Sequence, residues 1–543
     1  MTVYTSNAIA QGEAFDTDRA GMLSRIEELR ALERRAVDTS NRAAARFASR
    51  GQLLPRDRQA LLLDPGAPFL ELQSLAGFAM TDNGSDLDRE QSIPGGNQIV
   101  GIGFVAGTRC VVVITDSGIN AGAYNTAGIG KLLRAQRIAL ENRLPFVHLV
   151  ESAGANIASY RVDGFVNGGE MFANLARLSA AGVPVITVLH GSSTAGGAYM
   201  PGLSDVVVAV KDRAKAFLAG PPLLKAATGE IATDEELGGA TMHADVSGLV
   251  EHLAQDDADA IRIVRDVIAR LHWSDAISTA PRDYTEPRYP VDELAGIVPI
   301  DYRTPYDVRE VIARIVDGSE FVEFGARYGS ASVCVEAAVH GHPVAMIGNN
   351  GPIDNAGATK ISHFIQHCCH IGTPIIFLQN TTGYMVGTEH ERGGMIKNGS
   401  KMIQAVATAT VPRITLMIGA SFGAGNFGMC GRGYAPRFVL SWPNARIGLM
   451  GPEQAGVTMR TVAEASARRR GVEPDEAEMT ERHRSIADLI ERQSDAFYTS
   501  GRLLDDGVID PRDTRRALAF LLQTIREAEE IELRPITFGV ARH

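Results

Sequence analysis

The sequence predicts an α/β protein built from two related domains, and three observations support this fold class. The chain has 543 residues, too many for a single hydrophobic core, so two domains of ordinary size are expected. Apolar runs alternate with helical stretches, which is typical of a largely parallel sheet covered by helices. A small-residue turn also ends an apolar run in each half: Gly196 lies twelve residues after Pro184, and Ala424 lies twelve residues after Pro412.

The first half begins with a helical segment and then changes to β structure. Residues 18–50 are charged and rich in Ala and Leu, and they predict one peripheral helix. Pro55 and a turn at 64–68 follow. From Asn97 the pattern is that of two strands joined by a turn at Gly107–Thr108. The other elements expected in this half are helices at 130–142 and 170–182 and a charged helical region at 234–270.

The second half repeats this plan after a polar, proline-containing linker at 272–296. Two strands are expected within 331–351, and Asn355 to Ala358 then repeat the Asn-Ala-Gly-Ala sequence of residues 120–123. The offset between the halves changes only from 235 residues at this motif to 228 at the later turn, which indicates a duplication. The expected domains are residues 1–285 and residues 286–543, the second with a charged helical tail from 464 that ends in an amphipathic stretch at 515–530.

Composition and charge exclude several classes of partner. The formal net charge of −11 argues against nucleic acid or an anionic membrane as the main partner. Lys225, Arg432 and Arg437 still offer local positive charge to a small anionic ligand. No apolar stretch approaches the ~20 residues of a membrane span, and the first residues lack the apolar core of a secretory signal. Five cysteines, mostly in apolar runs, predict buried reduced thiols and a cytoplasmic enzyme.

Two ligand-binding patterns have a simpler structural interpretation. The glycines of 423–428 form a GxGxxG sequence, but no acidic residue follows at the spacing of a dinucleotide site. His363 and His367 share a helix face beside Cys368 and Cys369, a possible zinc pattern without a second ligand pair. We expect instead that this helix packs its cysteines into the core, and we expect no metal.

Ser421 lies in a GxSxG sequence, the pattern of the nucleophile in α/β-hydrolases. Only His483 and His543 follow it as bases in the chain order that such a triad needs. Ser193 occupies the matching place in the first half, so a turn or capping hydroxyl is the simpler interpretation. A serine hydrolase remains the alternative from another class of chemistry.

The two small-residue turns are the strongest chemical signal in the chain. Backbone N–H groups at the start of a helix, flanked by small residues, are suited to holding a developing negative oxygen. The pairs Gly196-Gly197 and Ala424-Gly425 lie at these positions. A close strand–helix packing corner is the structural alternative. Two such corners at equal spacing favour the functional interpretation, because two anions need two sites.

Several ordered segments carry a resemblance to a known family. Among them are STAGGAYMPGLSD at 193–205, FLAGPPLLKAATGE at 217–230, FLQNTTGYMVG at 377–387, FGAGNFGMCGRGYAPRF at 422–438 and WPNARIGLMGPEQ at 442–454. With them the chain resembles the carboxyltransferase (β) subunits of biotin-dependent acyl-CoA carboxylases over nearly its whole length. The resemblance implies two duplicated crotonase-like domains of the ClpP/crotonase superfamily. It also implies a homo-hexamer whose active sites lie between the N-domain of one subunit and the C-domain of another.

The same resemblance implies the roles of individual residues. The amides of Gly196 and Gly197 would stabilise the enolate of the acyl-CoA thioester, and those of Ala424 and Gly425 the ureido oxygen of biotin. The stretch 348–372 matches a region that binds acyl-CoA in such subunits. The implied substrate-binding residues are Ala198, Lys225, Thr228, Gly229, Asn349, Asn350, Gly351, Lys360 and His363, and the implied biotin-binding residues are Thr382, Gly383, Tyr384, Phe422, Gly423 and Asn426.

The segments resemble the methylcrotonoyl-CoA and geranyl-CoA branch, and Gly202 resembles geranyl-type members. The implied reaction moves a carboxyl group from carboxybiotin to a branched α,β-unsaturated acyl-CoA without a side-chain base. This agrees with the lack of an evident acid–base pair. Biotin is expected on a separate α subunit in an α6β6 holoenzyme, because the chain has no MKM attachment sequence. A propionyl- or acetyl-CoA carboxyltransferase and a non-catalytic CoA-binding subunit are the alternatives.

Overall fold

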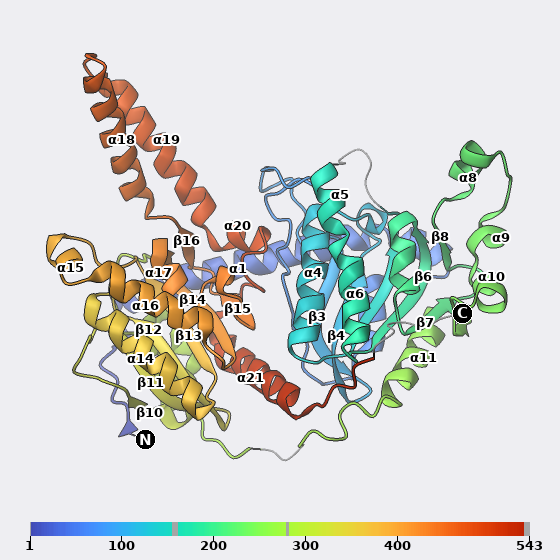
Figure 1. The fold of residues 1–543 in the computed structure, drawn as a ribbon, viewed down its shortest axis with the longest axis horizontal. Helices are drawn as coiled ribbons and strands as arrows, with labels where there is room; N and C mark the ends of the chain where they lie inside the picture. The colour runs from blue at the N-terminus through green and yellow to red at the C-terminus, as the bar shows by residue number, and fades with distance from the viewer. Residues whose placement is uncertain (1, 155–160, 279–281, 537–543) are drawn as a thin grey trace. The chain divides into compact units, whose positions relative to one another are not determined.

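The computed structural model describes residues 2–154, 161–278 and 282–536. The chain divides into two compact units, each built around one eight-stranded sheet (Figure 1). Each chain end belongs to the unit formed mainly by the opposite half of the sequence. The predicted domain limits of 1–285 and 286–543 stay a prediction. The N unit comprises Arg30–Thr279, Gly501–Leu503 and Gln523–His543, and the C unit comprises Met1–Leu29, Ala280–Ser500 and Leu504–Leu522.

The N-unit sheet has the order β2-β3-β4-β5-β6-β7-β9, with β8 beside the end of β6. Strands β3 and β4 form an antiparallel hairpin, and β4 to β7 run parallel. Every residue of β4 is buried, as expected for a β-branched run in the middle of a sheet covered on both faces. The strands are β2 (Leu70–Glu71), β3 (Gln98–Val105), β4 (Thr108–Thr115), β5 (Phe146–Ser152), β6 (Val185–Thr194), β7 (Val206–Val210), β8 (Lys215–Phe217) and β9 (His252–Ala254).

The C-unit sheet repeats this arrangement in the order β1-β10-β11-β12-β13-β14-β15, with β16 beside the end of β14. Again an antiparallel hairpin, β11 and β12, is followed by parallel strands. Apart from the edge strands β1 and β9, the two sheets have the same strand order and direction, which confirms the predicted α/β class and the duplication. The strands are β1 (Thr2–Val3), β10 (Glu320–Glu323), β11 (Ser332–Val339), β12 (His342–Asn349), β13 (Ile375–Thr381), β14 (Arg413–Phe422), β15 (Phe438–Ser441) and β16 (Arg446–Gly448).

Helices cover the faces of each sheet (Figure 1). In the N unit α4 packs on β3 and β4 and against α6. Its α-helices are α2 (Ala44–Ser49), α3 (Pro55–Leu62), α4 (Thr126–Glu141), α5 (Val162–Gly168), α6 (Glu170–Ala180), α7 (Tyr199–Gly202), α8 (Pro221–Thr228), α9 (Asp234–Gly238), α10 (Ala240–Met242) and α11 (Asp257–Ala269).

In the C unit α14 and α16 pack on each other and bury an apolar core against the sheet. Cys334, Cys368 and Cys430 lie in this core, as predicted, and all five cysteines are free. The helices are α12 (Leu294–Ile297), α13 (Val308–Ile315), α14 (Asn355–Ile371), α15 (Thr388–Arg392), α16 (Met395–Thr408), α17 (Gly423–Gly428), α18 (Pro452–Arg469), α19 (Glu476–Ser494) and α20 (Ala496–Gly501), while α1 (Glu13–Asn41) and α21 (Thr514–Glu530) contribute residues to both units.

Two predicted helical regions are different in the structure. Residues 18–50 form two helices, α1 and α2, because the chain turns at 42–43, and Phe47 of α2 is buried. The charged region 234–270 contains three α-helices and the short strand β9, which pairs in parallel with β7. Three residues are too few to show a strand period within a charged helical background. No described helix is both long and apolar enough to cross a membrane.

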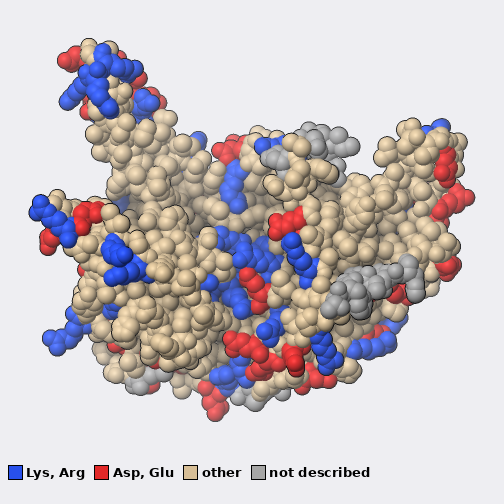
Figure 2. Space-filling model, in the orientation of Figure 1, with Lys and Arg blue, Asp and Glu red and all other residues tan. Residues whose placement is uncertain are grey.

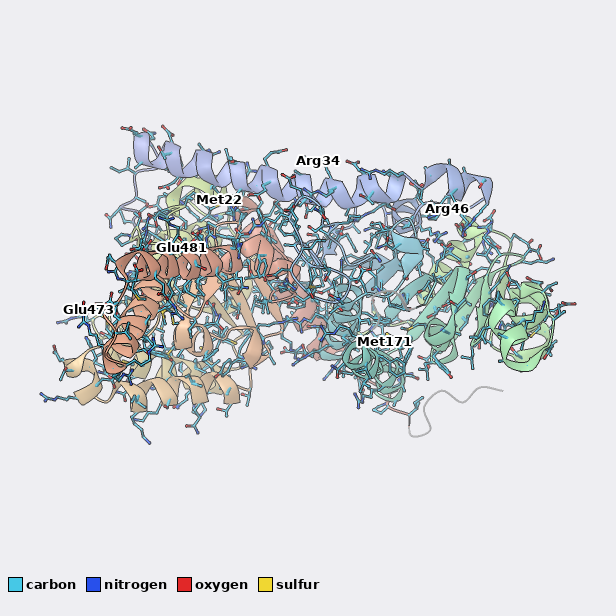
Figure 3. The ribbon with its side chains drawn as sticks, turned by 90° about the horizontal axis from the view of Figure 1, so that it is seen from above. Met22, Arg34, Arg46, Met171, Glu473 and Glu481 are labelled. Carbon is cyan, nitrogen blue, oxygen red and sulfur yellow. The ribbon has the colours of Figure 1, made fainter. Side chains whose placement is uncertain are left out.

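Helices α18 and α19 form a hairpin within the C unit. Basic residues gather at its outer end, where α18 finishes with Arg468 and Arg469 (Figure 2). Positive side chains there complement the negative end of the helix dipole. Glu473 lies in the turn of the hairpin and Glu481 on α19 (Figure 3).

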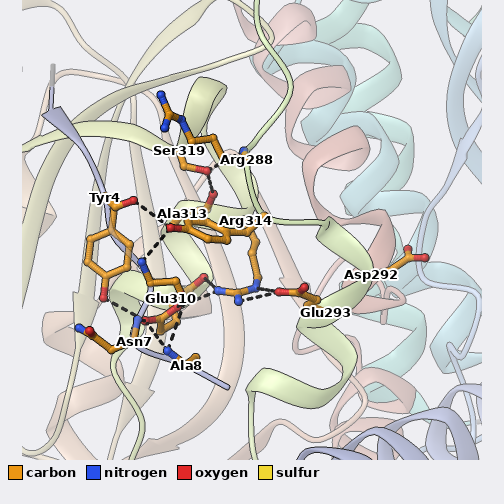
Figure 4. Close-up of polar contacts among 12 residues, drawn as sticks. Tyr4, Asn7, Ala8, Arg288, Asp292, Glu293, Glu310, Ala313, Arg314 and Ser319 are labelled. Carbon is orange, nitrogen blue, oxygen red and sulfur yellow. Dashed lines mark hydrogen bonds and ion pairs between the residues drawn. The ribbon is translucent and has the colours of Figure 1, made fainter. Parts of the chain in front are cut away.

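Glu310 on α13 fixes the first residues of the chain to the C unit (Figure 4). Its carboxylate accepts hydrogen bonds from Tyr4 Oη at 3.1 Å and from the Asn7 amide at 2.8 Å. Arg314 Nη1, 2.8 Å away, supplies the opposite charge. Because β1 pairs with β10, the N-terminal segment completes one edge of this sheet.

Asp505 is a fully buried carboxylate in the C unit. It accepts hydrogen bonds from Ser441 Oγ at 2.7 Å, Ser500 Oγ at 2.8 Å and the Gly507 amide at 3.1 Å. Burial raises the pKa of Asp505 to about 6 despite these donors. The folded protein therefore binds this proton more tightly than the unfolded chain, whose aspartates titrate at about 4.

We predict that Asp505→Asn raises the Tm at pH 8 relative to the wild type, because the ionised carboxylate is costly above its folded pKa. The expected gain in the free energy of unfolding is about 1–2 kcal/mol. This advantage should narrow as the pH falls from 6 towards 4, since the wild-type carboxyl becomes protonated in the folded state. Scanning calorimetry at pH 8, 6 and 5 measures the difference. A difference in Tm that does not change with pH would contradict the assignment.

Candidate active site

Each sheet contains a strand that runs into a left-handed residue and then a helical turn. In the N unit β6 ends at Thr194, and Ala195 (φ 52°) begins the 3-10 helix Ala195–Ala198. In the C unit β14 ends at Phe422, and Gly423 (φ 56°) begins α17. The left-handed conformation costs an alanine about 1–2 kcal/mol, so its surroundings hold Ala195 in place. The two turns share one backbone form.

The second residue of each pair is a glycine whose neighbours would crowd a side chain. A Cβ atom at Gly197 would lie 3.0 Å from Ser193 Oγ. A Cβ atom at Gly425 would lie 2.9 Å from Thr381 Cγ2 and 3.0 Å from Gly383 Cα. A bulky residue therefore strains either turn, most directly at Gly425, where backbone atoms of Gly383 lie in the way.

The amides of these turns are available as hydrogen-bond donors. The first N–H groups of any helix have no partner within the helix, and their dipoles give that end a partial positive charge. The N-cap residues Thr194 and Phe422 provide no side-chain cap. Within the pairs, Gly197 and Gly425 are buried, while the residue before each is at least partly exposed. Two adjacent donors at the start of a helix can chemically hold a developing negative oxygen.

Strand pairing confirms that the two turns are equivalent. Ser193 on β6 pairs with Ala216 of β8, and Ser421 on β14 pairs with Ile447 of β16. The strand before each one, β5 or β13, has a register shift near its end. The repeat inferred from the sequence therefore extends to irregularities of the backbone.

The residues predicted to bind biotin all lie at or beside the C-unit turn. A Cβ atom at Gly428 would collide with Tyr384 Oη, so the loop after β13 packs directly on α17. Asn426 directs its amide nitrogen at Ser421 Oγ, 2.7 Å away. The set consists of Thr382, Gly383 and Tyr384 from that loop and Phe422, Gly423 and Asn426 from the turn.

The residues predicted to bind substrate fall into two groups, one in each unit. In the N unit Ala198 ends the 3-10 helix of the turn. Lys225 and Thr228 lie on the exposed helix α8, and Gly229 is its left-handed C-cap. Helix α8 follows β8, the strand that flanks the turn. Ala198 therefore lies in the N-unit turn, and the other three residues lie on or just after the helix that follows its flanking strand.

In the C unit the predicted Lys360 is a buried structural lysine. Its Nζ donates to Gly325 O at 3.2 Å, as Lys131 in the N unit donates to Gln98 O at 2.8 Å. Burial lowers the pKa of Lys360, and lowers that of Lys131 to about 8. The others of this group are Asn349, buried at the end of β12, Asn350 and Gly351 after it, and His363, exposed on α14.

A cavity of about 780 Å³ lies in the N unit, at the carboxyl ends of its parallel strands. Ser152 and Ser192, near the ends of β5 and β6, belong to its wall. This cavity was not predicted from the sequence, although the run KDRAK at 211–215 after β7 was a signal for it. Five basic residues, Arg46, Arg50, Lys211, Arg213 and Lys215, line it together with only two acidic ones, Glu151 and Asp212.

A buried ionic network supports the floor of this cavity. Arg58 contacts Glu151 at 2.9 Å and Asp257 at 3.1 Å. Arg213 reaches Asp257 at 2.8 Å from the cavity side. Burial would raise the pKa of Asp257, but its hydrogen bond with His190 and the charge of Arg58 hold it well below its usual range. Both carboxylates thus stay ionised and orient the arginines.

The serine hydrolase alternative lacks the geometry of a triad. Ser421 is fully buried, and its Oγ donates to Gln379 Oε1 at 2.5 Å rather than contacting a base. His483, one of the two later histidines, contacts Glu453 on α18 at 3.2 Å. His543 lies outside the described residues.

The zinc pattern on α14 also takes a structural role. Cys368 packs in the core, His367 Nε2 lies 2.9 Å from Glu336, and His363 packs edge-on against Phe324. Within 2–154, 161–278 and 282–536 no group of three or more His, Cys, Asp or Glu side chains could hold a metal ion.

Comparisons with known proteins identify the family of this chain. The carboxyl transferase domain family matches residues 47–536. The chain is 48% identical to a probable biotin-dependent acyl-coenzyme A carboxylase β2 subunit of Mycobacterium tuberculosis, over 94% of this chain and 95% of that one. It is 44% identical to the biotin-dependent 3-methylcrotonyl-coenzyme A carboxylase β1 subunit of the same organism, over 99% and 100%.

Among solved structures, the β subunit of geranyl-CoA carboxylase from P. aeruginosa is 49% identical, covers 100% of both chains and superposes with a TM-score of 0.93. These relatives confirm the resemblance noted in the sequence and the crotonase-like fold. The chain belongs to the carboxyl transferase domain family, among the β subunits of biotin-dependent acyl-CoA carboxylases.

Proposed function

We propose that this protein transfers a carboxyl group from carboxybiotin, carried by a partner α subunit, to a branched α,β-unsaturated acyl-CoA. The observation that carries this proposal is the presence of the same amide turn in both units. Carboxyl transfer involves two anions, an enolate and the ureido group of biotin. A protein with two equivalent sets of donors meets that need without a catalytic side chain.

The N-unit turn holds the acyl-CoA thioester. The amides of Gly196 and Gly197 donate to the thioester oxygen, where negative charge develops when the acyl chain loses a proton. Because the donors are fixed before the reaction, they cost no reorganisation when that charge appears.

The C-unit turn holds the biotin ring, and its residues fit such a group. Gly383 and Gly425 leave bare backbone around the amides, as their close packing shows. Phe427 is about half exposed beside them and offers an apolar surface. Bound carboxybiotin supplies the carboxyl group; Ala424 and Gly425 donate hydrogen bonds to the ureido oxygen and orient the ring.

The basic cavity of the N unit holds the phosphates of CoA. A CoA thioester has several negative charges at its nucleotide end. Lys211 and Arg50 line the cavity, and Lys215, also in its wall, pairs with Asp234 at 2.9 Å. Ser192, which lines the cavity, lies four residues before Gly196 on the strand that leads into the turn. The cavity is therefore a local positive site for an anionic ligand on a protein whose formal net charge is −11.

We propose a long branched acyl chain of the geranyl type as the preferred substrate. Gly202, at the end of α7, has no atom within 4 Å of its Cβ position, so open space adjoins the turn. The geranyl-CoA carboxylase β subunit, at 49% identity, supports this more than the methylcrotonyl relative at 44%.

We also propose that the working site joins the N-unit turn of one subunit to the C-unit turn of another in a homo-hexamer, and that six α subunits complete an α6β6 holoenzyme. Large apolar side chains are exposed beside both turns: Tyr199 and Leu218 in the N unit, and Val386, Phe427 and Leu449 in the C unit. Exposed apolar clusters of this kind mark surfaces that another protein covers.

Replacing Gly197 or Gly425 by valine should lower kcat by about 10²–10³, because each change displaces a turn amide from its anion. Carboxylation of the acyl-CoA by the holoenzyme, followed as bicarbonate incorporation, measures the loss. Gly164→Ala and Gly433→Ala serve as controls in the two units, since neither Cβ position has an atom within 4 Å. Near-normal kcat in folded Gly197→Val or Gly425→Val protein would contradict the roles of the amides.

Lys211→Glu should raise the KM for acyl-CoA about tenfold or more with little change in kcat, because cavity charge acts on binding rather than on the reaction. The acyl-dephospho-CoA, which lacks the 3′-phosphate, should show a raised KM with the wild type and a smaller further rise with the variant. Arg262→Gln on the exposed face of α11 is the control. Equal wild-type KM values for acyl-CoA and acyl-dephospho-CoA would show that the 3′-phosphate does not bind in this cavity.

A panel of geranyl-, methylcrotonoyl-, propionyl- and acetyl-CoA should rank kcat/KM in that order, because the open space beside Gly202 leaves room for the longer chain. Gly202→Phe should reverse the order of the first two by filling the space. Highest kcat/KM with propionyl- or acetyl-CoA would establish the alternative branch.

A further inference from the structure

We propose that Gln379, Ser421 and Asn426 form a positioning network that holds the amides of Ala424 and Gly425 in place. This inference rests on the proposed function, in which those amides bind biotin. The network lies behind the C-unit turn and consists of one side chain from β13, one from β14 and one from α17.

Ser421 is the centre of the network. Its Oγ donates to Gln379 Oε1 at 2.5 Å and accepts from Asn426 Nδ2 at 2.7 Å. Asn426 Nδ2 also lies 3.4 Å from Gln379 Oε1. Ser421 and Gln379 are fully buried, so water does not compete with these hydrogen bonds.

The network connects both ends of α17 to the sheet. Ser421 lies two residues before Gly423, and Asn426 lies in the middle of the helix. Gln379 also donates from Nε2 to Met429 O at 2.7 Å, immediately after the helix ends. A shift of α17 along or away from β13 therefore breaks several hydrogen bonds at once.

The composition of α17 explains the need for such support. Its six residues, GAGNFG, include three glycines, and each glycine weakens a helix by about 0.5–1 kcal/mol relative to alanine. The glycines cannot be exchanged without loss: Gly425 admits no side chain, and a Cβ atom at Gly428 would collide with Tyr384 Oη. An intrinsically weak helix thus carries donors whose position must be exact to about 1 Å.

The N unit lacks this network at the equivalent turn. Val150 and Ala198 occupy the places of Gln379 and Asn426, and the equivalent Ser193 Oγ is buried without a hydrogen-bond partner among the described residues. The same strand and turn therefore form without the network. Its presence in the C unit alone indicates a role in positioning at that turn rather than in folding of the repeat.

The first test compares Ser421→Ala with its matched control Ser193→Ala. Purified β subunit is assayed for carboxyl transfer from a carboxylated acyl-CoA to free biotin, which needs no α subunit. We expect Ser421→Ala to lower kcat about 10- to 100-fold while the Kd for acyl-CoA stays unchanged, because a misplaced donor affects the transition state at the C-unit turn alone. Ser193→Ala should stay within about twofold of the wild type, since its hydroxyl has no hydrogen-bond partner in the described part of the chain. Equal effects of the two variants would overturn the proposal.

A double-mutant cycle separates positioning from direct contact. If Asn426 acts through Ser421, the Ser421→Ala and Asn426→Ala changes should not be additive in kcat, and the double variant should resemble Ser421→Ala. Additive losses would show that Asn426 contacts biotin itself, and the network would then have no positioning role.

Hydrogen exchange tests the network even without activity. Ser421→Ala should speed amide exchange in a peptide covering 423–430, whereas Ser193→Ala should leave 195–202 unchanged. If the wild type transfers no carboxyl group while exchange responds as expected, the proposed function fails and the network stands. Unchanged exchange in Ser421→Ala would refute the network whatever the activity.

Discussion

The structure depends on one constraint: a parallel strand must end in a turn whose first backbone amides have no partner within the helix and no side chain over them. A Cβ atom added at Gly197 or Gly425 would lie 3.0 Å or 2.9 Å from its nearest neighbour, closer than ordinary van der Waals contact. Both positions therefore favour glycine. The left-handed residue before each pair, Ala195 or Gly423, redirects the chain from strand to helix within one step. Everything proposed for catalysis follows from those donors.

Duplication supplies this constraint twice, and the two copies differ in what surrounds them. The N-unit turn adjoins a cavity whose cations are oriented by buried carboxylates, Glu151 and Asp257. The C-unit turn has instead a network of neutral polar side chains around Ser421. A charged, permanently anionic ligand end suits the first environment, and a neutral ring suits the second. The same backbone turn therefore lies in two different chemical environments.

Much of this was accessible from the sequence because it is local. The spacing from Pro184 to Gly196 and from Pro412 to Ala424 predicted two equivalent turns, and Ser193 correctly indicated that Ser421 was a turn hydroxyl rather than a nucleophile. What could not be predicted depends on convergence in space. Arg46 comes from α2 and Lys211 from the end of β7, and no period along the chain places them around one cavity. Strand β9 has only three residues, too few to show a strand period in the sequence. Lys360 matched a binding motif, but in the structure it is buried and donates to a backbone carbonyl.

The central claim is that amides from two units, contributed by two subunits, make one site. Co-assembly of Gly197→Val and Gly425→Val chains, each nearly inactive alone, examines it directly. If the account is correct, mixed hexamers regain about a quarter of the wild-type rate, because that share of sites combines an intact turn from each chain. Mixed assemblies as inactive as their parents would contradict it.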